Sequence, residues 1–169
     1  MKRQPLPEGS LVIEAAAPVD LPAIEALLRA CALPLEGVSD NINGFLTARW
    51  TRSDGPGAAT DGLIGCIGIE PYGEACVMRS FAIDPTYRGR GIMRPLIDAG
   101  LQRARDLGCR EAYLLTLTIE SLARRQGFHR VERADVPDDI LQCGEFRLTC
   151  CNSAIILRKN LDMRRSWQV

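Results

Sequence analysis

The chain has 169 residues, of which 46% are hydrophobic and 25% charged, a composition typical of a soluble globular protein. Lysine and arginine total 21, as do aspartate and glutamate, so the chain lacks the basic excess of a protein that binds nucleic acid. No stretch approaches the roughly 18 apolar residues of a membrane span, and residues 1–10 lack the apolar core of a secretory signal.

The first half of the chain predicts one helix among several strands. Hydrophobic patterning predicts a strand at 11–16 and, after Asp20 as a candidate N-cap, a helix at 21–31 with its apolar residues on one face. Three further strands are predicted, joined by turns that contain glycine, at 45–50, 62–70 and 75–83. Hairpins in series imply a mostly antiparallel sheet.

In the second half of the chain, the spacing of the apolar residues changes. It predicts a helix, a buried strand, a short helix and a last strand, at 92–107, 111–118, 119–128 and 152–161. Gly108 and Gly127 are natural ends for the two helices. This order makes the second half locally parallel. The prediction is one mixed α/β domain over residues 1–169, with flexible ends at 1–9 and 162–169.

The turn "YRGRGIMRPL" connects the strand at 75–83 to the following helix. Backbone N–H groups and the helix dipole at such a turn favour an anion, by on the order of 0.3–1 kcal/mol for each exposed interaction. Gly89 and Gly91 let the backbone approach phosphate oxygens without a Cβ, and neighbouring arginines add charge. The turn lacks the Gly-Lys-Ser/Thr of a nucleotide P-loop. It predicts a phosphate-bearing cofactor, with a plain strand-to-helix turn as the alternative.

The stretch "SFAIDPTYRGRGIMRPLI" resembles the acetyl-CoA motif of the GNAT superfamily of N-acetyltransferases, and the element order agrees over about the whole chain. That motif is a strand, a proline, then Arg/Gln-x-x-Gly-x-Gly/Ala opening a helix. Met93 stands where the family has a small residue. The resemblance implies a GNAT fold, in which a mixed, mostly antiparallel sheet is splayed in the middle and flanked by about four helices.

The resemblance also implies how acetyl-CoA is bound. The pyrophosphate would be held by the backbone of six consecutive residues, Arg88, Gly89, Arg90, Gly91, Ile92 and Met93. The pantetheine arm would pair with the strand residues Phe81, Ala82 and Ile83. Transfer to the amine would be direct and would need no metal.

The family's catalytic base and acid have less complete counterparts in this sequence than its acetyl-CoA motif has. Glu70 ends the strand at 62–70, where family members often keep the glutamate that deprotonates the amine; the alternative is a solvated carboxylate at a strand end. The family's usual acid, a tyrosine, corresponds to Ala123, so water or another side chain such as Tyr113 would protonate the thiolate. His129, the only histidine, is expected to be structural or exposed.

Within the superfamily, "GCIGIEPYGEACVMRSFAI" and "EFRLTCCNSAIIL" are similar to bacterial arsenic-resistance and amino-acid N-acetyltransferases. Such enzymes are thought to acetylate a glutamate-like amine, including arsenic- or phosphorus-containing analogues. Arg79 could hold the substrate's carboxylate bidentately, or be a surface arginine on the other side of the sheet. Ser80 and Glu36 are the other predicted substrate-binding residues, and Glu36 lies in a loop whose alternative role is simply solvation.

Two other functions stay open. N-acetylglutamate synthase shares the plan, but it carries tyrosine and arginine before the last strand, where this chain has Thr149 and Cys151. A non-catalytic sensor of acyl-CoA would explain the missing tyrosine. The expected partner is a small-molecule amine, with no nucleic acid and no membrane, and a homodimer is an expected assembly because dimers are common in the family.

Seven cysteines, an odd number and partly in apolar runs, indicate free thiols and a cytoplasmic protein. Cys143, Cys150 and Cys151 invite the idea of a thiolate cluster for trivalent arsenic. Successive strand side chains face opposite ways, which disfavours a shared centre for the two adjacent cysteines. No metal site is therefore predicted.

Overall fold

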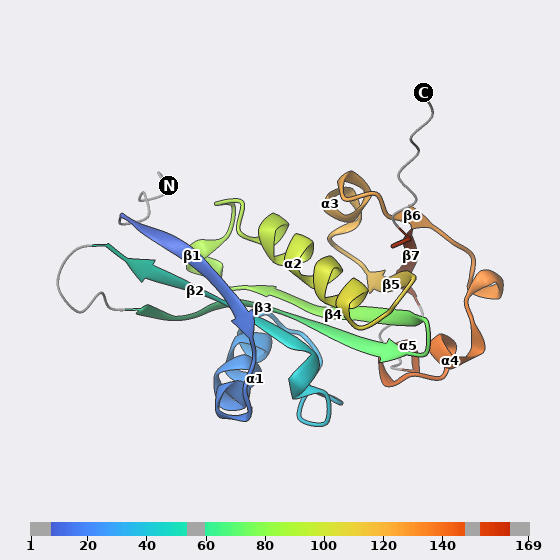
Figure 1. The fold of residues 1–169 in the computed structure, drawn as a ribbon, viewed down its shortest axis with the longest axis horizontal. Coiled ribbons are helices and arrows are strands. Elements are labelled where there is room, and N and C mark those ends of the chain that lie inside the picture. The colour runs from blue at the N-terminus through green and yellow to red at the C-terminus, as the bar shows by residue number, and fades with distance from the viewer. Residues whose placement is uncertain (1–7, 54–59, 148–152, 163–169) are drawn as a thin grey trace. The chain divides into compact units, whose positions relative to one another are not determined.

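The computed structural model describes residues 8–53, 60–147 and 153–162 (Figure 1). Within these ranges, seven strands form one sheet in the order β1-β2-β3-β4-β5-β7-β6. They are β1 (Gly9–Ala15), β2 (Phe45–Arg52), β3 (Thr60–Tyr72), β4 (Ala75–Ile83), β5 (Glu111–Thr116), β6 (His129–Arg130) and β7 (Ile155–Asn160). The α-helices are α1 (Leu21–Ala30), α2 (Met93–Asp106), α3 (Glu120–Arg125), α4 (Asp138–Leu141) and α5 (Gly144–Arg147). The predicted mixed α/β class is confirmed.

Strand pairing is mostly antiparallel. The pairs β1–β2, β2–β3, β5–β7 and β6–β7 are antiparallel, whereas β4–β5 is parallel because α2 connects these two strands. Among the described residues, β4 pairs with β5 at Ala75, Cys76 and Val77, although β4 itself continues to Ile83. The sheet therefore opens after Val77, as the predicted splay requires.

Contacts divide the chain into two compact units. The first unit comprises Met1–Gly68 and Ser80–Ala99, and the second comprises Ile69–Arg79 and Gly100–Val169. Strands β3 and β4 and helix α2 therefore contribute residues to both units. Each unit has a hydrophobic cluster of its own.

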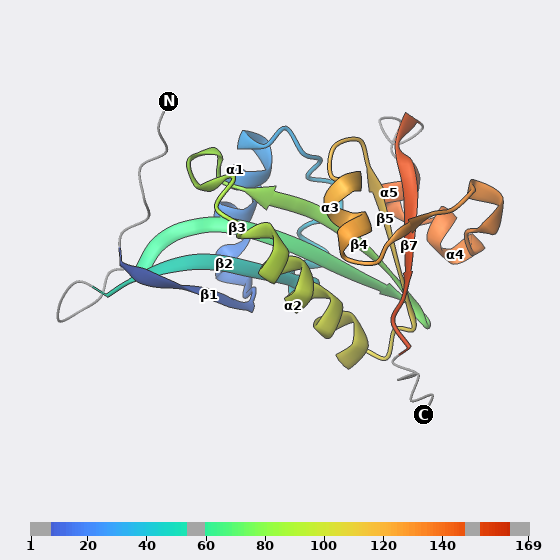
Figure 2. The same cartoon turned by 90° about the horizontal axis from the view of Figure 1, so that it is seen from above.

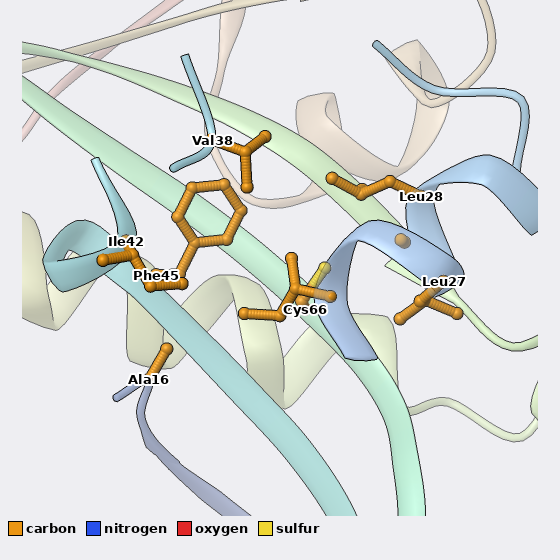
Figure 3. Packing of buried hydrophobic residues seen from close by; sticks show 9 residues of the cluster. Ala16, Leu27, Leu28, Val38, Ile42, Phe45 and Cys66 are labelled. Carbon is orange, nitrogen blue, oxygen red and sulfur yellow. The ribbon is translucent and has the colours of Figure 1, made fainter. Parts of the chain in front are cut away.

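The core of the first unit lies between α1 and strands β2 and β3 (Figure 3). Helix α1 places Ile24, Leu27 and Leu28 at the predicted i, i+3, i+4 spacing, and all three are buried. Phe45, at the start of β2, is fully buried, and its ring points toward Val38 (Figure 3). Burying a side chain of this size stabilises the fold by roughly 1.5–3 kcal/mol.

Two details of the first unit correct the sequence prediction. β1 begins at Gly9, which pairs with β2, so Gly9 belongs to the strand and not to a flexible end. Asp20 precedes α1, but its carboxylate accepts hydrogen bonds from the Ala17 backbone N–H at 2.8 Å and from Arg49 at 2.6 Å. Asp20 therefore closes the short 3-10 turn at Pro18–Asp20 instead of capping α1, because that turn directs its side chain back toward Ala17.

The core of the second unit packs α4 and α5 against the sheet. Ile140, Cys143 and Phe146 are buried in one cluster with Val77 and Tyr113. Figure 2 shows β7 alongside β5, with which it pairs over six residues. Helices α4 and α5 and strand β6 escaped prediction because segments of two to four residues show no readable period.

The predicted boundaries of α1 and α2 are confirmed within one residue, whereas α3 ends three residues before the predicted end at 128. Helix α2 is followed by Gly108 at φ +81°, and α3 by Gly127 at φ +87°, both in the left-handed conformation that ends helices. One face of α2, together with Ile92 just before it, is buried, namely Ile92, Leu96, Ile97, Gly100, Leu101 and Ala104. Within the described ranges, no helix has the length and apolar character needed to cross a bilayer.

Candidate active site

The turn between β4 and α2 has the backbone shape that the sequence predicts. Asp84 directly follows β4, and its carboxylate accepts a hydrogen bond from the Thr86 backbone N–H at 2.8 Å. Gly89 and Gly91 then adopt φ of +72° and +78°, which side chains disfavour, before α2 begins at Met93. A Cβ placed on Gly91 would meet no atom within 4 Å. The turn thus leaves open space beside the N-terminus of a 14-residue helix, which fits a bound phosphate.

The side chains of Arg88 and Arg90 stabilise the turn through hydrogen bonds. Arg88 donates from Nε to the Ile83 carbonyl oxygen at 3.0 Å and from Nη2 to the Cys31 sulfur at 3.2 Å. Arg90 donates to the Thr86 carbonyl at 3.2 Å. The sequence predicted only positive charge from these residues. The structure shows that they also hold the turn against the end of β4.

Ser80 interrupts β4 with a left-handed backbone. Its φ is +56°, a conformation that costs a residue other than glycine on the order of 1–3 kcal/mol. Arg79, directly before it, is buried, whereas Phe81, directly after it, is partly exposed. Ala82 and Ile83 are buried beyond it. Strain of this kind is often retained where a strand serves a functional site.

Glu70 and Arg79 form a buried ion pair in the second unit. Arg79 Nη1 donates to Glu70 Oε1 at 3.0 Å, and the two side chains are 2% and 3% exposed, respectively. The alternative of a solvated carboxylate at a strand end is therefore wrong for Glu70. The alternative of a surface arginine is equally wrong for Arg79. The structure brings together the predicted base and the predicted substrate-binding arginine.

Two further side chains join this pair, and the sequence reasoning missed both. The Glu145 carboxylate lies 3.3 Å from Arg79 Nη2, and the Tyr72 hydroxyl donates to Glu70 Oε2 at 2.9 Å. The i, i+2 spacing of Glu70 and Tyr72 on one strand could have revealed the second contact. No local signal reveals Glu145, which arrives from α5.

The Tyr72 hydroxyl also contacts the Cys143 thiol. Burial, followed by the Glu70 carboxylate, raises the pKa of Tyr72, so the phenol stays neutral at physiological pH. Burial likewise raises the pKa of Cys143. The cluster thus combines two carboxylates and one guanidinium with two neutral hydrogen-bonding groups.

The remaining predicted residues lie elsewhere. Glu36 is exposed in the segment between α1 and β2 of the first unit, and His129 is exposed in β6, as expected. Ala123 is buried on α3. The Tyr113 hydroxyl donates to Glu111 at 2.8 Å. Thr149, Cys150 and Cys151 lie outside the described residues, within which no three acidic, histidine or cysteine side chains gather as for a metal ion.

Comparison with known proteins identifies the family. The model of the "Acetyltransferase (GNAT) family" matches residues 23–133. The uncharacterized N-acetyltransferase YhbS of Escherichia coli (strain K12) is 30% identical over 135 residues, which cover 75% of this chain and 78% of that protein. The amino-acid acetyltransferase of Mycobacterium tuberculosis is 32% identical over 79 residues, or 46% of this chain and 45% of that protein.

A solved structure supports the fold. N-acetylglutamate synthase from Neisseria gonorrhoeae, complexed with coenzyme A and N-acetyl-glutamate, superposes with a TM-score of 0.71 at 20% identity. The match covers 92% of this chain and 36% of that chain. The matched family segment includes Glu70, Arg79 and the turn at 88–93. The chain therefore belongs to the acetyltransferase (GNAT) family and is an N-acetyltransferase.

Proposed function

We propose that the protein transfers the acetyl group of acetyl-CoA to the amine of a small amino-acid-like acceptor. The observation that carries this proposal is the buried Glu70–Arg79 pair, which puts a base and a carboxylate-binding cation in one cluster. The sequence similarity to an amino-acid acetyltransferase and the fold shared with N-acetylglutamate synthase support the same acceptor class.

In the proposed complex, acetyl-CoA binds to residues of the first unit. The backbone of residues 88–93 binds the pyrophosphate, helped by the open space at Gly91 and by the start of α2. Phe81, Ala82 and Ile83 pair with the pantetheine arm. The Ile83 carbonyl already accepts a hydrogen bond from Arg88 at 3.0 Å.

The chemical step assigns Glu70 as the base. An acceptor amine is an ammonium ion at neutral pH, so Glu70 first removes a proton, directly or through water. The neutral amine nitrogen then bonds to the thioester carbonyl carbon, and the carbon–sulfur bond breaks to release coenzyme A. Water takes the second proton of the amine nitrogen and passes a proton to the thiolate, because the usual tyrosine is Ala123.

The acceptor side uses Arg79, with Ser80 and Glu36 as further contacts. Both terminal nitrogens of Arg79 already lie against carboxylates, Glu70 on one side and Glu145 on the other. For Arg79 to bind the acceptor's carboxylate, Glu145 has to give up its place. Glu145 is the more exposed of the two, at 13%, and is therefore the one that the acceptor displaces.

Glutamate and its arsenic- or phosphorus-containing analogues are the acceptors that we expect in the cytoplasm. A role as an N-acetylglutamate synthase is the second candidate, favoured by the fold shared with that enzyme. The two candidates differ in whether the arsenic- and phosphorus-containing analogues are acetylated or glutamate alone.

The test is acetyl transfer from acetyl-CoA to a panel of amines, with products identified by mass spectrometry. The panel contains glutamate, phosphinothricin, arsinothricin, other amino acids, glutamate analogues without the α-carboxylate, and a lysine peptide. We expect turnover confined to glutamate-like acceptors. Preference for the lysine peptide, or for amines without a carboxylate, would refute the amino-acid assignment.

A variant sharpens the test of Arg79. Glu145→Gln removes the competing charge but keeps the shape, so we expect KM for a carboxylate-bearing acceptor to fall by about 3- to 10-fold. The KM for the matching decarboxylated amine should stay unchanged. A rise in both KM values would show that Glu145 only orients Arg79.

A further inference from the structure

The burial of Glu70 raises a question that the proposed function does not answer. Converting an ammonium ion and acetyl-CoA into an amide and a thiol releases one proton per turnover. If Glu70 receives that proton, as the proposed function assumes, the proton has to leave before the next cycle. The Glu70 side chain is 3% exposed, so bulk water does not collect the proton from it directly.

Among the described residues that contact Glu70, one could pass a proton onward. Arg79, against Oε1, carries a guanidinium that only donates hydrogen bonds. Tyr72, against Oε2, has a hydroxyl that both donates and accepts. Glu145 faces Arg79, on the side of the guanidinium away from Glu70. Tyr72 is therefore the contact of Glu70 with the right chemistry for a relay.

Tyr72 also leads from the buried cluster to the surface. Its side chain is partly exposed and lines an open pocket of about 370 Å³ in the second unit, together with Gly73, Asp139, Gln142 and Cys143. Asp139, on α4, is an exposed carboxylate in this wall and can receive a proton from the pocket's water. One side chain thus touches both the proposed base and a space large enough for several water molecules.

We propose that Tyr72 is the outlet for the proton that Glu70 accepts. When Glu70 becomes protonated, the Tyr72 hydroxyl, which donates to Glu70 in the structure, turns toward the pocket, and its oxygen then accepts the Glu70 proton while the phenolic proton passes to water. One O–H bond forms at Tyr72 and one breaks, so the phenol is neutral before and after and Glu70 returns to its ionised form. The neutral state that burial favours for Tyr72 is the state this relay needs.

The test is Tyr72→Phe, which keeps the ring and removes the hydroxyl. We expect kcat to fall at least 10-fold at saturating concentrations of both substrates, with KM for acetyl-CoA within about twofold of the wild-type value. Imidazole, a proton carrier small enough to enter the pocket, should restore kcat of the variant by several-fold and leave the wild type unaffected. A structural role alone would not produce rescue by a buffer.

Tyr113→Phe supplies the matched stability control, because Tyr113 donates to Glu111 at 2.8 Å with the same i, i+2 spacing in the same unit. Equal losses of Tm in the two variants would show that Tyr72→Phe is folded as well as its control. A kcat within twofold of the wild type, or a lowered kcat that imidazole does not raise, would overturn the proposal. Absence of acetyl transfer in the wild-type protein would instead refute the proposed function, and the outlet with it.

Discussion

The Arg79 guanidinium lies 3.0 Å from the Glu70 carboxylate, with both side chains almost completely buried. A buried ion pair is weak evidence for stability, since desolvating two charges offsets much of their attraction. Arg79 of this pair directly precedes Ser80, whose backbone is itself strained. Two unfavourable features at adjacent positions of β4 are better explained by the site than by the fold.

Replacing Glu70 with Gln should lower kcat by about 100- to 1,000-fold, because the amide cannot take the amine's proton. The affinity for coenzyme A, measured by calorimetry, should stay within about threefold. The matched control is Glu111→Gln, since Glu111 accepts from Tyr113 and pairs with Arg158 much as Glu70 does with Tyr72 and Arg79. Equal losses of kcat in both variants would contradict the assignment of Glu70 as the base.

Replacing Arg79 with Ala should destabilise the protein by about 3–5 kcal/mol, because it leaves Glu70 buried without its counter-charge. Urea unfolding measures this cost. Arg110→Ala is the control, since Arg110 pairs with Glu74 at an exposed site and its loss should cost under about 1 kcal/mol. Similar costs for the two variants would argue that the Glu70–Arg79 pair is solvated in solution.

Replacing Gly91 with Ala tests the phosphate cradle. The positive φ makes the substitution cost about 1–2 kcal/mol of stability, and the new Cβ projects into the space proposed for the phosphate. Gly108→Ala meets the same strain and equally open space after α2. We expect equal losses of Tm, but a loss of coenzyme A affinity of at least 10-fold only for Gly91→Ala. Unchanged affinity in that variant would place the pyrophosphate elsewhere.

Replacing Ala32 with Gly should stabilise the protein by about 0.5–1 kcal/mol. Ala32 follows α1 at φ +54°, and the bond from the Leu33 N–H to the Leu28 carbonyl at 2.9 Å closes the helix end around it. Glycine reaches this conformation without strain, whereas Ala26→Gly inside the same helix should destabilise by about 1 kcal/mol. Thermal unfolding compares the two, and a loss of stability in both would show that Ala32 is not strained.

Among the five described cysteines, Cys31 should react first with iodoacetamide. Burial raises the pKa of Cys66 to about 12, so this thiol stays protonated and unreactive at pH 8. Cys31 is partly exposed, whereas Cys66, Cys76, Cys109 and Cys143 are buried. Peptide mass spectrometry gives the order of modification, and urea should abolish the difference. Modification of Cys66 ahead of Cys31 would contradict the burial.

Much of the fold can be predicted from the sequence because helices and turns are specified by neighbouring residues. Helix α1 is visible in the spacing of three apolar residues, and the β4–α2 turn in two glycines whose positive φ few other residues tolerate. Chain order then implies the parallel β4–β5 pair. Asp20 shows the limit of this reasoning, because a preceding 3-10 turn and Arg49 of β2 decide where its carboxylate lies.

The amino-acid sequence alone establishes the family plan, the strand-to-helix turn and the residue types of the site. The folded structure adds that Glu70 and Arg79 are buried against each other, that Ser80 has a left-handed backbone within β4, and that Glu145 and Tyr72 complete the cluster. The physical reason is that a glycine or a helix period acts through neighbouring residues. The burial of a charge, in contrast, depends on which distant segments the folded chain packs around it.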